Sequence, residues 1–114
     1  MAFWFSESHT DNVKLEILVD EQLYSQKSEY QKIDIFQSRE FGRILTLDDV
    51  IVLTEKDEFI YHEMIVHPAM AVHPNVKRVL VVGAGDGGAL RELGRYPGIE
   101  SIDVVEIDGM LVDA

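Results

Sequence analysis

Hydrophobic and polar residues alternate along the first half of the chain, which is the pattern of half-buried strands. Four segments are predicted as strands on this basis: residues 13–19, 31–35, 43–47 and 50–54. In the second of these, Gln31 falls on the apolar face and Asp34 on the polar face. Asp48 and Asp49 separate the last two strands and indicate a hairpin. The sequence therefore predicts a small antiparallel β-domain over residues 1–55.

A helix is predicted to follow these strands. Residues 54–57 fit a capping box, in which Asp57 is an alternative cap, and mostly apolar residues continue to Ile65. Pro68 lacks a backbone donor and is expected to stop or kink the helix. Residues 56–75 are accordingly predicted to form a connecting helix and turn.

From Val76 onward the apolar residues form continuous runs, which are typical of parallel strands buried on both faces. Residues 79–82 and 102–107 are such runs, and residues 89–96 between them predict a helix. Two parallel strands do not complete a doubly wound sheet. We therefore predict an α/β protein in which the β-domain precedes the start of a Rossmann-like, class I methyltransferase-like domain over residues 76–114, truncated after its second parallel strand.

A glycine-rich loop lies between the first of these parallel strands and the following helix. Gly83, Gly85 and Gly88 match G-x-G-x-x-G, and Gly87 adds a further glycine. Glu106 ends the next strand, where an acidic residue commonly accepts hydrogen bonds from ribose hydroxyls. This arrangement predicts a site for an adenosine-type ligand. The alternatives are a tight turn without a ligand and a carboxylate that is merely solvated.

Asp86 bears on the charge of that ligand. Next to the pyrophosphate of a dinucleotide, a carboxylate would cost about 4 kcal/mol for each phosphate charge at about 4 Å. A sulfonium or ammonium group would instead be attracted, so Asp86 favours S-adenosylmethionine chemistry over nicotinamide chemistry. The alternative role for Asp86 is a helix N-cap, and the two roles are compatible.

His62, Glu63 and His67 resemble a zinc-binding helix, but their spacing is wrong for one. The second histidine follows the first by five residues, so the two diverge by about 140° around a helix. We therefore predict no metal site. Tyr61 and His62 are expected to line a pocket next to the glycine loop, with packing in the core as the alternative.

The composition of the chain indicates which classes of binding partner are disfavoured. The chain of 114 residues has 21 acidic and 10 basic residues, giving a net charge of -11. Such a charge opposes binding to nucleic acid or anionic membranes and attracts cations, although it also serves solubility. The chain has no cysteine, no apolar run long enough for a transmembrane helix and no secretory signal pattern, which suits a cytoplasmic protein.

Five segments resemble the polyamine aminopropyltransferases, and they occur in that family's order. They are FWFSE at 3–7, SEYQ at 28–31, EKDEFIYHEM at 55–64, VVGAGDGG at 81–88 and VEIDG at 105–109. The combination of YHEM with the GDGG loop is highly specific, and the chain is most similar to the bacterial spermidine synthases of this family. The resemblance covers nearly the whole chain.

The resemblance implies transfer of an aminopropyl group from decarboxylated S-adenosylmethionine to putrescine, which yields spermidine and methylthioadenosine without a further cofactor. It implies that Gln31 and Glu106 bind the thioadenosine part, with Glu106 on the ribose. Asp86 would hold the amine or aminopropyl nitrogen, and Tyr61 and His62 would border the polyamine groove. Family members usually assemble as homodimers or homotetramers.

Three departures from the family pattern matter. Ala84 stands where the family usually has glycine, and Asp49 replaces the glycine of the usual Leu-Asp-Gly turn, which should strain that hairpin. The family's proton-accepting aspartate is expected beyond Ala114, so we expect no catalytic residue in this segment and no turnover by it alone. A class I methyltransferase and a non-catalytic β-rich assembly module remain the alternative functions, and the amine acceptor is left open.

Overall fold

The computed structural model describes residues 3–83 and 85–114. The chain divides into two compact units, Met1–Asp57 and Glu58–Ala114. The first unit is all β and the second alternates helices and strands, as the sequence predicts.

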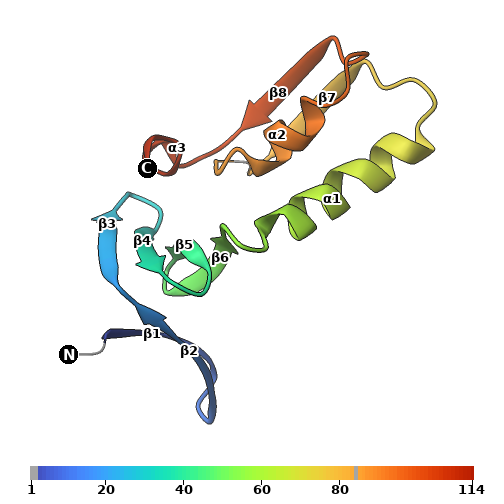
Figure 1. Cartoon of the computed structure of the whole chain (residues 1–114). Coiled ribbons are helices and arrows are strands. Elements are labelled where there is room, and N and C mark those ends of the chain that lie inside the picture. The colour runs from blue at the N-terminus through green and yellow to red at the C-terminus, as the bar shows by residue number, and fades with distance from the viewer. Residues whose placement is uncertain (1–2, 84) are drawn as a thin grey trace. The chain divides into compact units, whose positions relative to one another are not determined.

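The first unit contains two antiparallel sheets (Figure 1). Its strands are β1 (Phe3–Thr10), β2 (Val13–Val19), β3 (Glu21–Lys27), β4 (Lys32–Ser38), β5 (Gly42–Leu47) and β6 (Val50–Thr54). The first two pair with each other, and the other four form a sheet in the order β3-β4-β5-β6. Neither β1 nor β3 was predicted as a strand, because both consist largely of polar or exposed residues without clear alternation.

The core of this unit joins the two sheets. The buried side chains that form it are Phe5, Ile17, Val19, Phe36 and Ile44. The rings of Phe5 and Phe36 lie 5.2 Å apart at 40°. Glu7 of β1 adds a polar link, because its Oε2 accepts a hydrogen bond from the Ile51 amide of β6 at 2.5 Å.

Strand β4 differs from its predicted pattern. Gln31 precedes the strand and closes a turn, in which its N–H donates to the Ser28 hydroxyl at 3.1 Å. Asp34, predicted on the polar face, is only 1% exposed. Its carboxylate accepts a hydrogen bond from the Gln22 side chain at 2.9 Å and pairs with the Lys32 ammonium at 3.4 Å. β4 is an inner strand between β3 and β5, and these partners stabilise a buried charge there.

The hairpin between β5 and β6 is built without glycine. Asp48 and Asp49 have φ values of 52° and 64°. Two positive φ angles define a type I′ turn, which matches the right-handed twist of the strands but usually needs Gly or Asn. The expected strain at Asp49 is therefore confirmed.

The second unit is a short βαβ arrangement preceded by a helix (Figure 1). Its elements are α1 (Glu58–Val72), β7 (Arg78–Val82), α2 (Gly88–Leu93), β8 (Ser101–Val105) and α3 (Gly109–Asp113). β7 and β8 pair in parallel, as predicted. Pro68 does not stop α1, which continues to Val72. The predicted helix over residues 89–96 ends earlier, at Leu93, where Gly94 is the C-cap.

Only one face of the parallel strands is covered within this chain. Val66, Ala89 and Leu93 pack over Val79 and Val81 on that face. On the other face, Leu80 is 65% exposed and Val82 is 75% exposed. Within residues 58–83 and 85–114 no element covers that second face, so the expectation that these strands are buried on both faces is wrong within this unit.

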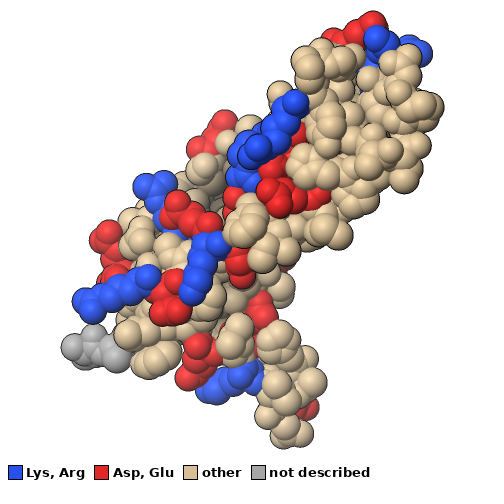
Figure 2. All heavy atoms as spheres, turned by 45° about the vertical axis from the view of Figure 1, so that its right-hand side comes forward, with Lys and Arg blue, Asp and Glu red and all other residues tan. Residues whose placement is uncertain are grey.

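Charges of both signs lie next to one another on the surface. The face shown in Figure 2 has lysine and arginine side chains beside aspartate and glutamate, without a broad basic patch. Among the described residues, no helix is long and apolar enough to cross a membrane.

Candidate functional site

The predicted glycine loop and Glu106 lie together at the carboxyl end of the two parallel strands. The glycine loop follows β7, and Glu106 follows β8. Because the strands are parallel, both segments leave the sheet at its carboxyl end, where α/β proteins bind ligands. The Gly83 amide donates to the Val105 carbonyl at 2.7 Å and thereby joins the two strand ends.

Two glycines of the loop adopt conformations that other residues avoid. Gly83 has a φ of 77° and Gly87 a φ of 79°. A Cβ at either position would meet nothing within 4 Å, so the requirement for glycine there is conformational rather than steric. Ala84 lies outside the described residues.

Glu106 shapes the loop with both of its carboxylate oxygens. Oε1 accepts a hydrogen bond from the Gly85 amide, and Oε2 accepts one from the Asp108 amide, each at 3.1 Å. A Cβ on Gly85 would lie 2.8 Å from Oε1, so glycine permits this close approach. A carboxylate has about four lone-pair sites, so Glu106 keeps acceptor capacity for a ligand.

Asp86 also uses its two oxygens differently. Oδ1 accepts a hydrogen bond from the Gly88 amide at 3.0 Å, at the first residue of α2. Oδ2 lies 3.5 Å from Nε2 of His62. The N-cap of α2 is Gly87, so the alternative role of Asp86 as the N-cap is wrong. Its Oδ1 instead accepts from the amide two residues on, and its second oxygen is directed to the histidine.

His62 lies against the glycine loop, while its predicted place in the lining of a ligand pocket stays a prediction. Its side chain is 3% exposed, and a Cβ on Gly88 would fall 2.2 Å from the ring. Tyr61 is 63% exposed, with its ring edge-on to that of His62 at 5.2 Å. Of the predicted pair, only His62 contacts the loop, and Tyr61 is open to solvent.

Two charged residues that the sequence analysis did not identify complete this cluster. Glu58 Oε2 lies 2.5 Å from Nδ1 of His62, and the Arg91 guanidinium binds both oxygens of Glu58, at 2.5 and 3.0 Å. Hydrogen bonding from Arg91 holds the pKa of Glu58 below its ordinary value, although desolvation opposes this. The spacing of four residues between Glu58 and His62 on a helix could have indicated the first contact. No local pattern indicates Arg91.

His67 takes part in a different cluster. Its Nδ1 lies 2.6 Å from the Tyr96 hydroxyl, and its Nε2 lies 3.9 Å from the buried Glu92. The two histidines thus have separate partners. Across residues 3–83 and 85–114, no group of three or more His, Asp or Glu side chains is arranged to hold a metal ion.

Gln31 belongs to the first unit, where it closes the turn before β4. Its proposed contact with a ligand stays a prediction.

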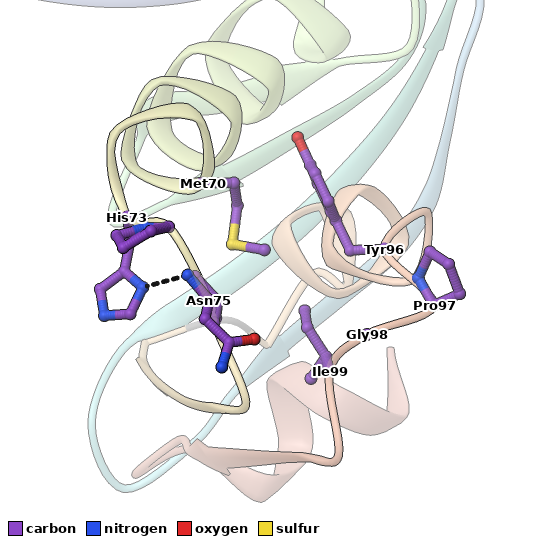
Figure 3. A pocket seen from close by; sticks show the side chains of 9 residues that line it. Met70, His73, Asn75, Tyr96, Pro97, Gly98 and Ile99 are labelled. Carbon is purple, nitrogen blue, oxygen red and sulfur yellow. Dashed lines mark hydrogen bonds between the residues drawn. The ribbon is translucent and has the colours of Figure 1, made fainter.

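A separate pocket lies at the amino-terminal end of the two parallel strands (Figure 3). It has a volume of about 230 Å³ and is lined by residues 70, 73–76 and 96–99. Met70 lies in the last turn of α1, and the other lining residues form the connections that lead into β7 and β8. Inside it, the Asn75 amide donates to Nδ1 of His73 at 3.1 Å. None of the predicted ligand-binding residues lines this pocket, so it is distinct from the glycine-loop site.

The chain matches two family descriptions and many curated proteins. Residues 3–55 match the spermidine synthase tetramerisation domain, and residues 58–114 match the spermine/spermidine synthase domain. A polyamine aminopropyltransferase of Clostridium perfringens is 62% identical over 113 residues, which are 99% of this chain and 40% of that protein. One from Clostridium botulinum is 59% identical over 114 residues, again 40% of its length.

Solved structures agree with these sequence matches. The spermidine synthase of Thermotoga maritima matches with a TM-score of 0.95 and 42% identity, covering 98% of this chain and 40% of that one. A spermidine synthase in complex with the transition state analogue AdoDATO matches with a TM-score of 0.94. The chain spans about 40% of the length of these relatives. The β-domain, the parallel strands with their glycine loop, and both family matches together establish that the chain belongs to the spermine/spermidine synthase family.

Proposed function

We propose that the whole protein is an aminopropyltransferase that moves the aminopropyl group of decarboxylated S-adenosylmethionine to putrescine, giving spermidine and methylthioadenosine. Family membership supports this activity, and the chain contributes the first part of the binding site. A spermidine synthase of 42% identity binds the transition state analogue AdoDATO, which supports a ligand of this kind.

The observation that carries the proposal is the placement of Asp86. Its carboxylate lies on the glycine loop, where nicotinamide enzymes bind the negatively charged pyrophosphate. One of its oxygens is taken up by the Gly88 amide, and the other faces His62. An aminopropyl ammonium, a sulfonium or a polyamine is attracted to this carboxylate, whereas a phosphate is repelled.

The chemistry needs an oriented and neutral amine. The putrescine nitrogen attacks the carbon beside the sulfonium, a C–N bond forms, the C–S bond breaks, and methylthioadenosine leaves uncharged. A free primary amine has a pKa near 10, so it must lose a proton to attack. Asp86 positions the nitrogen in this scheme, and a carboxylate base takes the proton.

Glu106 would hold the nucleoside. Its carboxylate lies at the end of β8 with acceptor capacity beyond its two amide contacts, so ribose hydroxyls can donate to it. We propose that Gln31 also contacts the thioadenosine part. The cytoplasmic location stays a prediction.

Calorimetry on the purified whole protein tests these assignments. Asp86→Asn should weaken binding of decarboxylated S-adenosylmethionine more than binding of methylthioadenosine, because only the former is cationic. Equal losses would mean that Asp86 only orders the loop through the Gly88 amide. Glu106→Gln should cost both nucleosides about 1.5–3 kcal/mol, the value of a charged hydrogen bond.

Putrescine separates this proposal from the alternative methyltransferase activity. An aminopropyltransferase releases methylthioadenosine when putrescine and decarboxylated S-adenosylmethionine are both present. Turnover of S-adenosylmethionine without any dependence on putrescine would contradict the proposal.

We also propose that the first unit mediates assembly into a homodimer or homotetramer. Its family description as a tetramerisation domain supports this. Large apolar side chains on β1 and β2 are open to solvent, among them Trp4 at 51% and Leu15 at 48% exposed. Light scattering should give an oligomeric mass for the protein and a lower mass for Trp4→Glu, and a monomeric mass for the unmodified protein would contradict it.

A further inference from the structure

A chain of polar contacts leads from α2 through α1 to the glycine loop. The Arg91 guanidinium donates to both oxygens of Glu58, and Glu58 contacts Nδ1 of His62 at 2.5 Å. The opposite ring nitrogen, Nε2, lies 3.5 Å from Oδ2 of Asp86. The Arg91 backbone amide donates to the Gly87 carbonyl at 3.0 Å, whereas its side chain is linked to the loop through Glu58 and His62.

Packing confines the His62 ring. The side chain is 3% exposed and lies against Gly88, where a Cβ would come within 2.2 Å of the ring. Tyr61 covers it edge-on at 5.2 Å. The plane of the ring is thus set by packing, whereas its hydrogen bonds decide which nitrogen carries the proton.

Glu58 decides that question because it is an acceptor. The two hydrogen bonds from Arg91 keep the pKa of Glu58 below its ordinary value, so the carboxylate is ionised near neutral pH and offers only lone pairs. A short contact between Glu58 Oε2 and His62 Nδ1 is favourable when Nδ1 carries the proton. In the neutral ring, Nε2 then presents a lone pair toward Asp86.

Nε2 of His62 and Oδ2 of Asp86 lie 3.5 Å apart, and with a neutral ring protonated on Nδ1 both atoms are acceptors. Nothing on either atom donates to the other in this state. A primary ammonium group has three donors and can give one hydrogen bond to each acceptor at about 2.9 Å. A ribose hydroxyl or a thioether does not provide this combination of positive charge and several donors.

We propose that Glu58, held by Arg91, is a positioning residue that makes His62 an acceptor, so that His62 and Asp86 jointly bind a primary ammonium group. This inference rests on the proposed function and adds two residues to it. It assigns neither of them a contact with the substrate. It also explains why a bidentate ion pair lies behind the buried histidine.

The test uses Glu58→Gln in the whole protein. The carboxamide of glutamine can donate to Nδ1, which would place the proton on Nε2 and leave a donor facing Asp86. Nitrogen NMR of labelled histidine should report Nδ1–H for His62 in the unmodified protein and Nε2–H in the variant. Putrescine affinity should fall about tenfold or more, while methylthioadenosine affinity should change by less than about twofold, as expected for a site that the change does not touch.

Two further variants separate positioning from structural damage. Arg91→Lys keeps the charge next to Glu58 but loses the bidentate geometry, so it should give a smaller loss for putrescine and retain Nδ1–H. Glu100→Gln is the matched control, because Glu100 forms an exposed ion pair with Lys77 at 3.8 Å in the same unit. It should leave both affinities and the His62 signals unchanged.

The outcomes distinguish this inference from the proposed function. An unchanged His62 tautomer in Glu58→Gln, or equal losses for putrescine and methylthioadenosine, would overturn the positioning role. If the unmodified protein binds no putrescine, the proposed function and the ammonium site both fail, and the NMR signals still show whether Glu58 sets the tautomer. Should Glu58→Gln not fold, Arg91→Lys provides the same comparison, and equal losses for both ligands there would overturn the proposal.

Discussion

The two units of the chain enclose their sheets to different extents. In the β-unit, Phe36 is 4% and Ile44 is 0% exposed, since the two sheets pack against each other. In the α/β unit, helices cover Val79 and Val81, but Leu80 on the reverse face is 65% exposed. The first unit derives its stability from side chains that it contains entirely. The second unit commits its helices to one face, and its polar residues gather at the strand ends.

The largest loss of stability is expected from a substitution in the core of the β-unit, compared with one on the open face of the α/β unit. Phe36→Ala removes a ring that packs on Phe5 and Phe3, and it should destabilise the β-unit by about 3–5 kcal/mol. Leu80→Ala, on the open face, should change stability by less than about 0.5 kcal/mol. Urea unfolding measures both. A similar cost for the two variants would mean that the open face is covered in solution.

The next largest effect on stability is expected from removing the partner of a buried carboxylate in the α/β unit. Glu92 is 0% exposed, and Arg95 donates to it at 2.8 Å. Arg95→Ala would leave this carboxylate without its nearest partner and should cost about 3 kcal/mol. Lys77→Ala, which breaks an exposed pair, should cost about 0.5 kcal/mol or less. Equal losses of unfolding free energy for the two variants in chemical denaturation would show that Arg95 contributes little to stabilising the buried Glu92 carboxylate.

A smaller effect, of opposite sign, is expected in the β-unit. Asp49 has a φ of 64°, which glycine adopts without the steric cost that other residues meet. Asp49→Gly should therefore stabilise the protein by about 0.5 kcal/mol, since relief of strain exceeds the added freedom of the unfolded chain. Asp49→Asn removes the charge near Lys32 and keeps a residue that tolerates this conformation. Both variants remove the charge, so equal unfolding temperatures for Asp49→Asn and Asp49→Gly would assign the effect to charge instead of strain.

The smallest effect is a pH dependence confined to the α/β unit. The pKa of Glu58 is lowered from 4.5, chiefly by Arg91. A carboxyl group with a lowered pKa in the folded state contributes stability above its unfolded pKa, and this contribution is lost as the pH falls through the folded value. Stability should therefore decline below about pH 4.5 more steeply in the unmodified protein than in Arg91→Gln. Parallel acid titrations of the two proteins would contradict this.

The sequence predicted the order of strands and helices better than the surroundings of single residues. Alternation located four of the six strands of the β-unit, and the continuous apolar runs located both parallel strands. Pro68 was expected to stop or kink the helix, and it does not stop α1, which continues past it to Val72. A proline costs one backbone hydrogen bond, and the neighbouring turns of a helix can outweigh that loss.

For the candidate site too, the position of the elements could be predicted, whereas the contacts of single side chains could not. The glycine loop and Glu106 could be placed together because parallel strands end at one edge. Asp34 could not be recognised as buried, since its partners come from other strand positions and the pattern of β4 alone puts it on the polar face. The contact between Arg91 and Glu58 spans 33 residues, and such pairings depend on how the helices pack.

The hydrogen bond from Ile51 to Glu7 has a consequence for what the β-unit leaves exposed to other chains. β6 is an outer strand of its sheet, and an outer strand offers free amides on which a foreign strand can extend the sheet. The Glu7 carboxylate accepts a hydrogen bond from one of these amides, that of Ile51, at 2.5 Å and places a negative charge beside the outer strand β6. The family description of this unit as a spermidine synthase tetramerisation domain concerns ordered assembly. Addition of a foreign strand to β6 is a different route of association, and the Glu7 carboxylate hinders it at its first hydrogen bond.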